Sequence, residues 1–152
     1  MQQHEDQGSS AVESTSASCI KRYKVSETFG EFEVRLEVDH NILTPARAKE
    51  INEFWGSPED RIAAEKGDEV KAVIRLAGSR AAAMILCDGW GGASFGTGKP
   101  EAGEIWSKQF RAQEGWGGEE DTPFGWCGIR IIGADVEMPG FDEFELREVA
   151  NA

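Results

Sequence analysis

Apolar and charged residues alternate most regularly in the segment FEVRLEV, residues 32–38. A period of two is typical of a strand that buries one face and exposes the other. The segment IKRYKVS, residues 20–26, is also rich in β-prone residues, and a short connection that contains Gly30 separates the two segments. The pattern therefore predicts a β-hairpin at the start of the folded chain.

Helical patterns follow the predicted hairpin. Thr44 is followed by a proline, which predicts an N-cap and the first turn of a helix that ends at Gly56. Ser57 is also followed by a proline and two acidic residues, which predicts that it caps a second, short helix ending near Gly67. Residues 68–87 place apolar side chains three or four positions apart, and this spacing predicts a long core helix.

Glycine-rich sequence changes the pattern in the second half of the chain. Residues 88–100 hold five glycines and are expected to lack regular structure, whereas residues 101–113 are expected to form a short helix. Two β-prone segments follow, WCGIRII at 126–132 and FDEFELREV at 141–149. The order of elements predicts an α+β fold, in which an N-terminal β-hairpin and a C-terminal strand pair form an antiparallel sheet with about three helices packed on one face.

A length of 152 residues with 39% apolar residues is sufficient for one hydrophobic core. We expect residues 20–150 to form a single α+β domain and the polar, acidic residues 1–19 to be a disordered tail. The three cysteines form no C-x-x-C pair and only two histidines are present, so neither a disulfide framework nor a zinc site is indicated. No apolar run approaches the roughly 18 residues of a membrane span, and no signal-peptide pattern is present, so we expect a cytoplasmic protein.

Charge narrows the class of partner. The chain has 28 acidic and 16 basic residues, a net charge of -12. Residues 112–152 hold ten of the acids and only two arginines, a net charge of -8. Direct contact with nucleic acid or an anionic membrane is disfavoured because phosphate groups would be repelled, whereas a basic protein surface would be attracted. High net charge also keeps proteins soluble, so the acidity fits either solubility or mimicry of a polyanion.

The sequence contains no complete motif for catalysis or cofactor binding. The segment ASFGTGKP, residues 93–100, resembles a phosphate-binding loop, but an alanine replaces its first glycine and a proline replaces the hydroxyl residue that holds magnesium. His40 lies between an aspartate and an asparagine, in a position where polar residues are favoured for shaping a turn. We therefore assign no catalytic residue, no metal ligand and no cofactor.

Two loops repeat an acid-Gly-Trp-Gly-Gly motif, at residues 88–92 and 114–118. Their tryptophans either pack onto the core, as most tryptophans do, or anchor an interface that acidic residues surround. For the second alternative, the candidate partner-binding residues are Trp90, Trp116, Glu114, Glu119, Glu120, Asp121, Asp142 and Glu143.

Several short segments together resemble a known family. These segments are INEFW at 51–55, EDR at 59–61, VKAVIRLA at 70–77, EGW at 114–116 and CGIRII at 127–132. Their pattern resembles the bacterial and phage family known as domain of unknown function 2528, over about residues 21–149. The resemblance implies a small accessory protein carried by phages, plasmids or integrated elements, and it implies no activity.

The leading hypothesis is a non-enzymatic, acidic binding protein of a mobile element. In this hypothesis the protein mimics nucleic acid and inhibits a host defence protein or another nucleic-acid-binding protein, because its carboxylates occupy the partner's basic groove. A second hypothesis is a small-ligand-binding or minor enzymatic role, for which Trp90, Trp116 and His40 would line one pocket. A third is a structural subunit of a larger assembly, and the sequence leaves the oligomeric state open.

Overall fold

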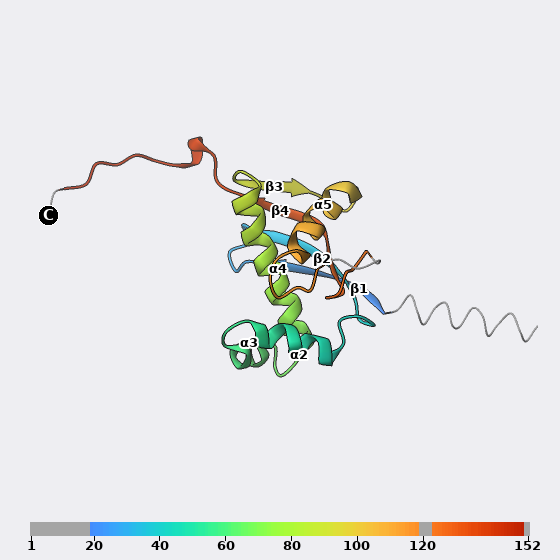
Figure 1. Cartoon of the computed structure of the whole chain (residues 1–152). Helices are drawn as coiled ribbons and strands as arrows, with labels where there is room; N and C mark the ends of the chain where they lie inside the picture. Colours follow the sequence, from blue (N-terminus) through green and yellow to red (C-terminus); the bar gives the residue numbers. More distant parts are fainter. Residues whose placement is uncertain (1–18, 119–122, 151–152) are drawn as a thin grey trace, which may run out of the picture.

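The computed structural model describes residues 19–118 and 123–150 of the chain. Its four strands form one antiparallel sheet in the order β1-β2-β4-β3 (Figure 1). The strands are β1 (Ile20–Ser26), β2 (Glu33–Asp39), β3 (Gly92–Phe95) and β4 (Ile129–Glu137). The helices are α2 (Pro45–Phe54), α3 (Pro58–Ala64), α4 (Glu69–Asp88) and α5 (Pro100–Arg111). The predicted α+β class is confirmed, with four helices instead of about three.

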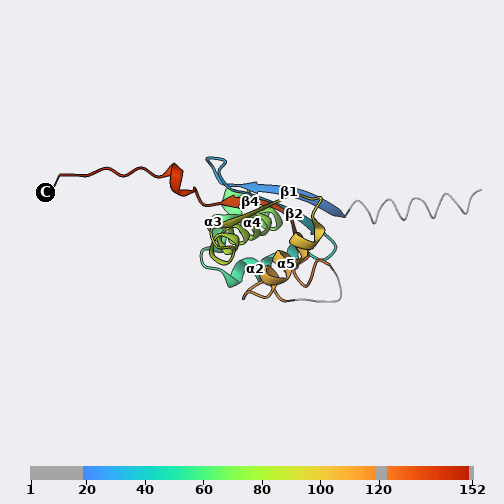
Figure 2. The same ribbon diagram turned by 90° about the horizontal axis from the view of Figure 1, so that it is seen from above.

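The sheet and the helices form two layers. Seen from above, the strands lie on one side and the helices on the other (Figure 2). The predicted hairpin is confirmed, since β1 pairs with β2 and Tyr23 lies opposite Leu36. The alternation of β2 follows from this arrangement, because its apolar side chains face the helices and its charged side chains face away from them. Between β2 and β4 the register shifts after Arg35, which leaves Ile132 of β4 unpaired as a β-bulge.

The core lies between the sheet and α4, the predicted long helix. Leu36 and Ile131 on the sheet are buried, as are Val73 and Ile85 on α4. The helix approaches β1 so closely that a Cβ atom on Gly78 would lie 2.4 Å from Cβ of Val25.

Side-chain caps begin α2 and α4 but not α3. The hydroxyl of Thr44 accepts a hydrogen bond from the backbone N–H of Arg47 at 3.2 Å, as predicted, and Asp68 caps α4. The prediction that Ser57 caps α3 is wrong, because its backbone adopts the left-handed conformation (φ 59°) and its side chain makes no capping bond.

Residues 88–100 are more ordered than the sequence predicted. Gly92–Phe95 form β3, which pairs with the end of β4 from Ala134 to Glu137. A four-residue strand with one glycine has little intrinsic β preference, so it forms because the edge of β4 offers a partner.

The prediction of a second C-terminal strand is wrong. Phe141–Glu143 form a single turn of 3₁₀ helix, η1, and the residues that follow belong to no strand. This segment extends away from the domain (Figures 1 and 2), with its apolar side chains exposed. The alternating pattern is real, but β3 already occupies the edge of β4 beside which this segment begins.

Candidate partner-binding surface

The candidate residues from the sequence lie in different environments. Trp90 is in the turn between α4 and β3, and 99% of its surface is exposed. Trp116 follows α5 and is fully buried, so it is a core residue and not a surface anchor. Glu114 is exposed, whereas Glu119, Glu120 and Asp121 lie outside the described residues.

The second Gly-Trp loop closes over its own tryptophan. The Trp116 ring packs against Phe110 with 4.5 Å between ring centroids and against Trp55 with 6.1 Å. Gly117 has a positive φ of 83°, and a Cβ atom there would lie 2.1 Å from the ring of Trp126. Gly117 therefore lets the backbone approach the Trp126 ring where a side chain would clash.

The first Gly-Trp loop places its tryptophan on the outside. Trp90 has a φ of 57°, in the left-handed region that costs an L-residue other than glycine about 1–2 kcal/mol. Gly92 approaches β4 so closely that a Cβ atom would lie 1.9 Å from the carbonyl oxygen of Val136. The motif thus forms a tight reversal from α4 into β3, and the exposed indole sits at its apex.

Pairing of β3 with β4 brings the end of β4 beside Trp90. Gly92 lies opposite Glu137, and the N–H of Met138 donates to the carbonyl of Gly91 at 2.7 Å. Met138 is 54% exposed. Phe141, three residues further along, is 92% exposed at the start of η1.

Five exposed residues, Trp90, Met138, Phe141, Asp142 and Glu143, make up what we call the Trp90 surface. Asp142 and Glu143 belong to η1, and the carboxylate of Glu143 accepts a hydrogen bond from the N–H of Gly140 at 2.9 Å. Residues 137–146 carry four acids and no lysine or arginine. The surface therefore combines exposed apolar side chains with the acidic residues of the segment that follows β4.

Glu114 does not belong to the Trp90 surface. It follows α5, whose Arg111 donates to the carbonyl of Ile129 at the first residue of β4. Trp90 lies beside Glu137, the last residue of that strand. Nine strand residues span about 27 Å, so Glu114 and Trp90 lie at opposite ends of β4.

The family-like segments INEFW at 51–55 and EDR at 59–61 have a structural role. The side chain of Asn52 is fully buried and donates to the carbonyl of Pro58 at 3.2 Å and to Glu69 at 3.0 Å. Its carbonyl oxygen accepts from Arg61 at 2.7 Å, and Arg61 also binds the carbonyl of Gly56 at the end of α2. The residues Asn52 and Arg61 of the motif therefore hold α2, α3 and α4 together.

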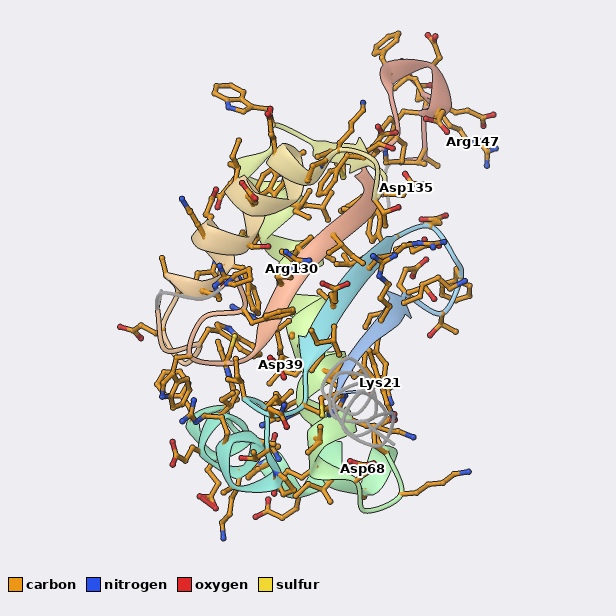
Figure 3. The ribbon with its side chains drawn as sticks, turned by 90° about the vertical axis from the view of Figure 1, so that its right-hand side faces the viewer. Lys21, Asp39, Asp68, Arg130, Asp135 and Arg147 are labelled. Atoms are coloured by element: carbon orange, nitrogen blue, oxygen red, sulfur yellow. The ribbon has the colours of Figure 1, made fainter. Side chains whose placement is uncertain are left out.

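His40 lies at the end of the sheet opposite to Trp90. Its Nε2 atom is 2.8 Å from the hydroxyl of Tyr23. Burial and Lys21 lower the pKa of His40 below its ordinary value, against the opposing effect of the aspartates. Figure 3 shows Lys21, Asp39 and Asp68 gathered at this end of the molecule and Asp135 near the other end. The Asn41 N–H binds the Asp39 carboxylate at 2.9 Å, so the predicted turn is present.

The pocket required by the small-ligand hypothesis is not formed by these residues. Trp116 is buried, and Trp90 and His40 lie at opposite ends of the sheet. Two surface clefts, of about 470 and 350 Å³, are lined by other side chains. Within residues 19–118 and 123–150, no group of three His, Cys, Asp or Glu residues is arranged to hold a metal ion. In that same part of the chain, no helix has the length and apolarity to cross a membrane.

Sequence reasoning missed Met138 and Phe141. Met138 lies between the two predicted C-terminal strands, and Phe141 was assigned to the second of them. The exposure of Phe141 depends on the chain leaving the sheet after β4, which the alternating pattern of residues 141–149 did not indicate.

The family comparison agrees with the resemblance seen in the sequence. A family model described as "Protein of unknown function (DUF2528)" matches residues 33–146. The comparisons with curated proteins and with solved structures returned no match.

Proposed function

Since the chain belongs to the DUF2528 family, whose description assigns no function, we propose a function from its own surface. The protein is a non-enzymatic binding protein that docks its Trp90 surface on a basic protein partner. The exposure of Trp90 carries this proposal. The Trp90 indole is 99% exposed, so it contributes little to the stability of the fold. Its backbone is in the strained left-handed conformation, and strained residues are concentrated at functional sites.

The chemistry of the Trp90 surface supports an aromatic anchor combined with acidic residues. A tryptophan that becomes buried on binding removes about 150–250 Å² of surface from water, and tryptophan is enriched among residues that dominate binding energy. Asp142 and Glu143 follow in η1, a few residues beyond Met138, so their charge attracts a basic partner over a longer range before the indole is buried.

More specifically, we propose that the partner is a nucleic-acid-binding protein. The net charge of -12 and the acids of residues 137–146 support mimicry of a polyanion. The protein then acts stoichiometrically, by occupying the groove in which a host defence protein binds nucleic acid. Such a role fits an accessory protein that is carried by a phage or plasmid, as the family resemblance implies.

Capture from a host lysate tests the proposal with matched variants. The tagged wild-type chain, Trp90→Ser and Ile105→Ser are compared, because Ile105 is a 66% exposed apolar residue on α5, outside the Trp90 surface. We expect one partner to bind wild type and Ile105→Ser and to be lost with Trp90→Ser. Capture that is the same for all three proteins would contradict the proposal.

A second measurement separates the general proposal from mimicry. Binding is repeated with Asp142→Asn/Glu143→Gln, at increasing salt, and in competition with duplex DNA. Mimicry requires that the neutralised variant binds more weakly and that DNA displaces the protein from its partner. It also requires that high salt releases the partner, because the screening length of charges falls to about 3 Å at 1 M salt. A Trp90-dependent partner that DNA does not displace would retain the binding function and eliminate the nucleic-acid mimic.

A further inference from the structure

The free edge of β1 is a second interaction surface. Within the described residues, β1 pairs only with β2, and its other edge has no strand beside it. Cys19 accepts a backbone hydrogen bond from His40, and Glu27 donates one to Phe32, so the odd-numbered residues pair inward. Alternate residues of an antiparallel strand bond to opposite sides. The backbone groups of Arg22 and Lys24 therefore face the free edge.

The chemistry of this edge is the reverse of the chain as a whole. Three of the seven residues of β1 are basic, Lys21, Arg22 and Lys24. Basic edge strands repel one another, which prevents pairing between two copies of β1. Arg22 is bound to Glu37, whereas Lys24 has no ion-pair partner in the described part of the chain. Lys24 is thus available to an acidic strand.

A cleft with a mixed lining adjoins the same edge on its helix side, and Lys24, Ser26 and Glu65 belong to its polar part. It has a volume of about 470 Å³ and includes Tyr23, Val25 and Ile74 in its lining. Lys71 and Arg75 of α4 also border it. The side chains of Tyr23, Val25 and Ile74 offer a contact surface to the apolar side chains of an added strand.

The C-terminal arm, residues 144–150, has the complementary pattern. Phe144 is in extended conformation (φ -106°, ψ 140°) and 61% exposed, and Leu146 is fully exposed. In an extended chain these two side chains lie on one face, and Glu145 lies on the other. The arm leads away from its own domain (Figure 1). Figure 3 shows Arg147 beyond the Asp135 end of β4.

We propose that the arm of one copy adds as a fifth strand to the free edge of β1 in a second copy, and that exchange of two arms forms a dimer. Pairing with Phe144 and Leu146 toward the cleft places Glu145 on the open face with Lys24. Glu145 and Lys24 lie on the same face whether the arm pairs parallel or antiparallel to β1, because paired residues of neighbouring strands point to the same face of the sheet. Addition of a strand also satisfies the free backbone groups of β1.

Sedimentation velocity of the full chain over a range of concentrations tests the proposal. Wild type is expected to dimerise, and Phe144→Ser/Leu146→Ser to weaken the dimer at least about tenfold, because two apolar side chains no longer enter the cleft. The control Ile105→Ser removes an apolar side chain of α5 that is about as exposed as Phe144, and it should leave the dimer unchanged. The arm makes few contacts in the monomer, so these variants keep their thermal stability.

Charge reversal identifies the docking site. Glu145→Lys and Lys24→Glu should each weaken the dimer, and the chain carrying both should recover it, because both exchanged contacts are restored. Hydrogen exchange should show the amides of Arg22 and Lys24 protected in wild type and unprotected in Phe144→Ser/Leu146→Ser. Three results would overturn the proposal: a monomer at every concentration, a dimer that survives loss of Phe144 and Leu146, or a monomer whose β1 amides are protected by its own arm.

Discussion

The hydroxyl of Ser107 binds both backbone groups of Ile131. It accepts from the N–H of Ile131 at 2.8 Å and donates to its carbonyl at 3.2 Å. Arg111, one turn later on α5, donates to the carbonyl of Ile129 at 3.0 Å. β3 pairs only with residues 134–137 of β4, so these two buried side chains satisfy the part of the edge that lacks a strand. Helix α5 therefore takes the place of a neighbouring strand along this part of β4.

Ser107→Ala is expected to lower the free energy of unfolding by about 1–3 kcal/mol, because it leaves the buried N–H and carbonyl of Ile131 without a partner. Denaturant unfolding measures this change. Ser79→Ala is the matched control, since the exposed Ser79 hydroxyl binds the carbonyl of Leu76 in its own helix. An equal, small effect of both substitutions would contradict the assigned role of Ser107.

Gly78→Ala should destabilise the protein although it lies inside a helix. Alanine normally stabilises a helix by about 0.5–1 kcal/mol relative to glycine. Here its Cβ atom would lie 2.4 Å from Cβ of Val25, so α4 and β1 must move apart, at a cost of about 1–3 kcal/mol.

A double-mutant cycle with Val25→Ala tests the cause of this effect. Removal of the two Val25 methyl groups relieves part of the contact, so Gly78→Ala should cost less in the Val25→Ala background than in wild type. Additive effects would show that the cost does not arise from the contact with Val25.

Structure was predicted correctly where the conformation depends on residues that are adjacent in the sequence. The alternation of residues 32–38 predicted β2, and Thr44 before a proline predicted the start of α2. Ser57 had the same local signature, but its backbone is left-handed and its hydroxyl makes no cap. Local sequence therefore predicted the helix and not its hydrogen bonding.

The two strand errors arise from pairing, which sequence does not display. Gly92–Phe95 have a weak β pattern and pair with β4, whereas residues 141–149 have a strong pattern and pair with nothing within the described monomer. The candidate surface was predicted in part for the same reason. Trp90 was named from its Gly-Trp motif, and Asp142 and Glu143 from the acidity of the C-terminal third. Only the pairing of β3 with β4 brings Trp90 to the end of the sheet from which η1 follows.

Glu37 gives the protein a defined response to acid. The residue is 7% exposed, and its carboxylate binds Arg22 at 3.1 Å and Arg130 at 2.8 Å. Burial raises the pKa of Glu37, but the hydrogen bonds and charges of Arg130 and Arg22 outweigh it, and the pKa lies below the ordinary value of 4.5. The stabilisation is therefore complete above the unfolded-state pKa and is lost as the pH falls through the folded-state pKa.

Glu37→Gln should lower the free energy of unfolding near neutral pH by about 1–3 kcal/mol, and the difference from wild type should shrink below about pH 4. Denaturant unfolding at several pH values measures both effects. Glu33→Gln removes an ion pair with Arg35 that is more exposed, and it should change stability by less than about 1 kcal/mol. A Glu37→Gln effect that stays constant into acid would exclude the carboxylate as its source.

Trp90 and Trp116 have the same sequence motif and should respond to substitution in opposite ways. Trp116→Ala is expected to lower the free energy of unfolding by about 3–5 kcal/mol, because it empties a fully buried site. Trp116→Phe should cost much less, since it refills most of the volume and removes an indole N–H that has no partner within the described residues. Trp90→Gly should leave the protein at least as stable as wild type, because glycine adopts the left-handed conformation without strain and only exposed contacts are lost. Thermal unfolding of the three variants, measured beside partner binding, separates the roles: a substantial loss of stability in Trp90→Gly would make Trp90 a structural residue and remove the main support for the proposed binding surface.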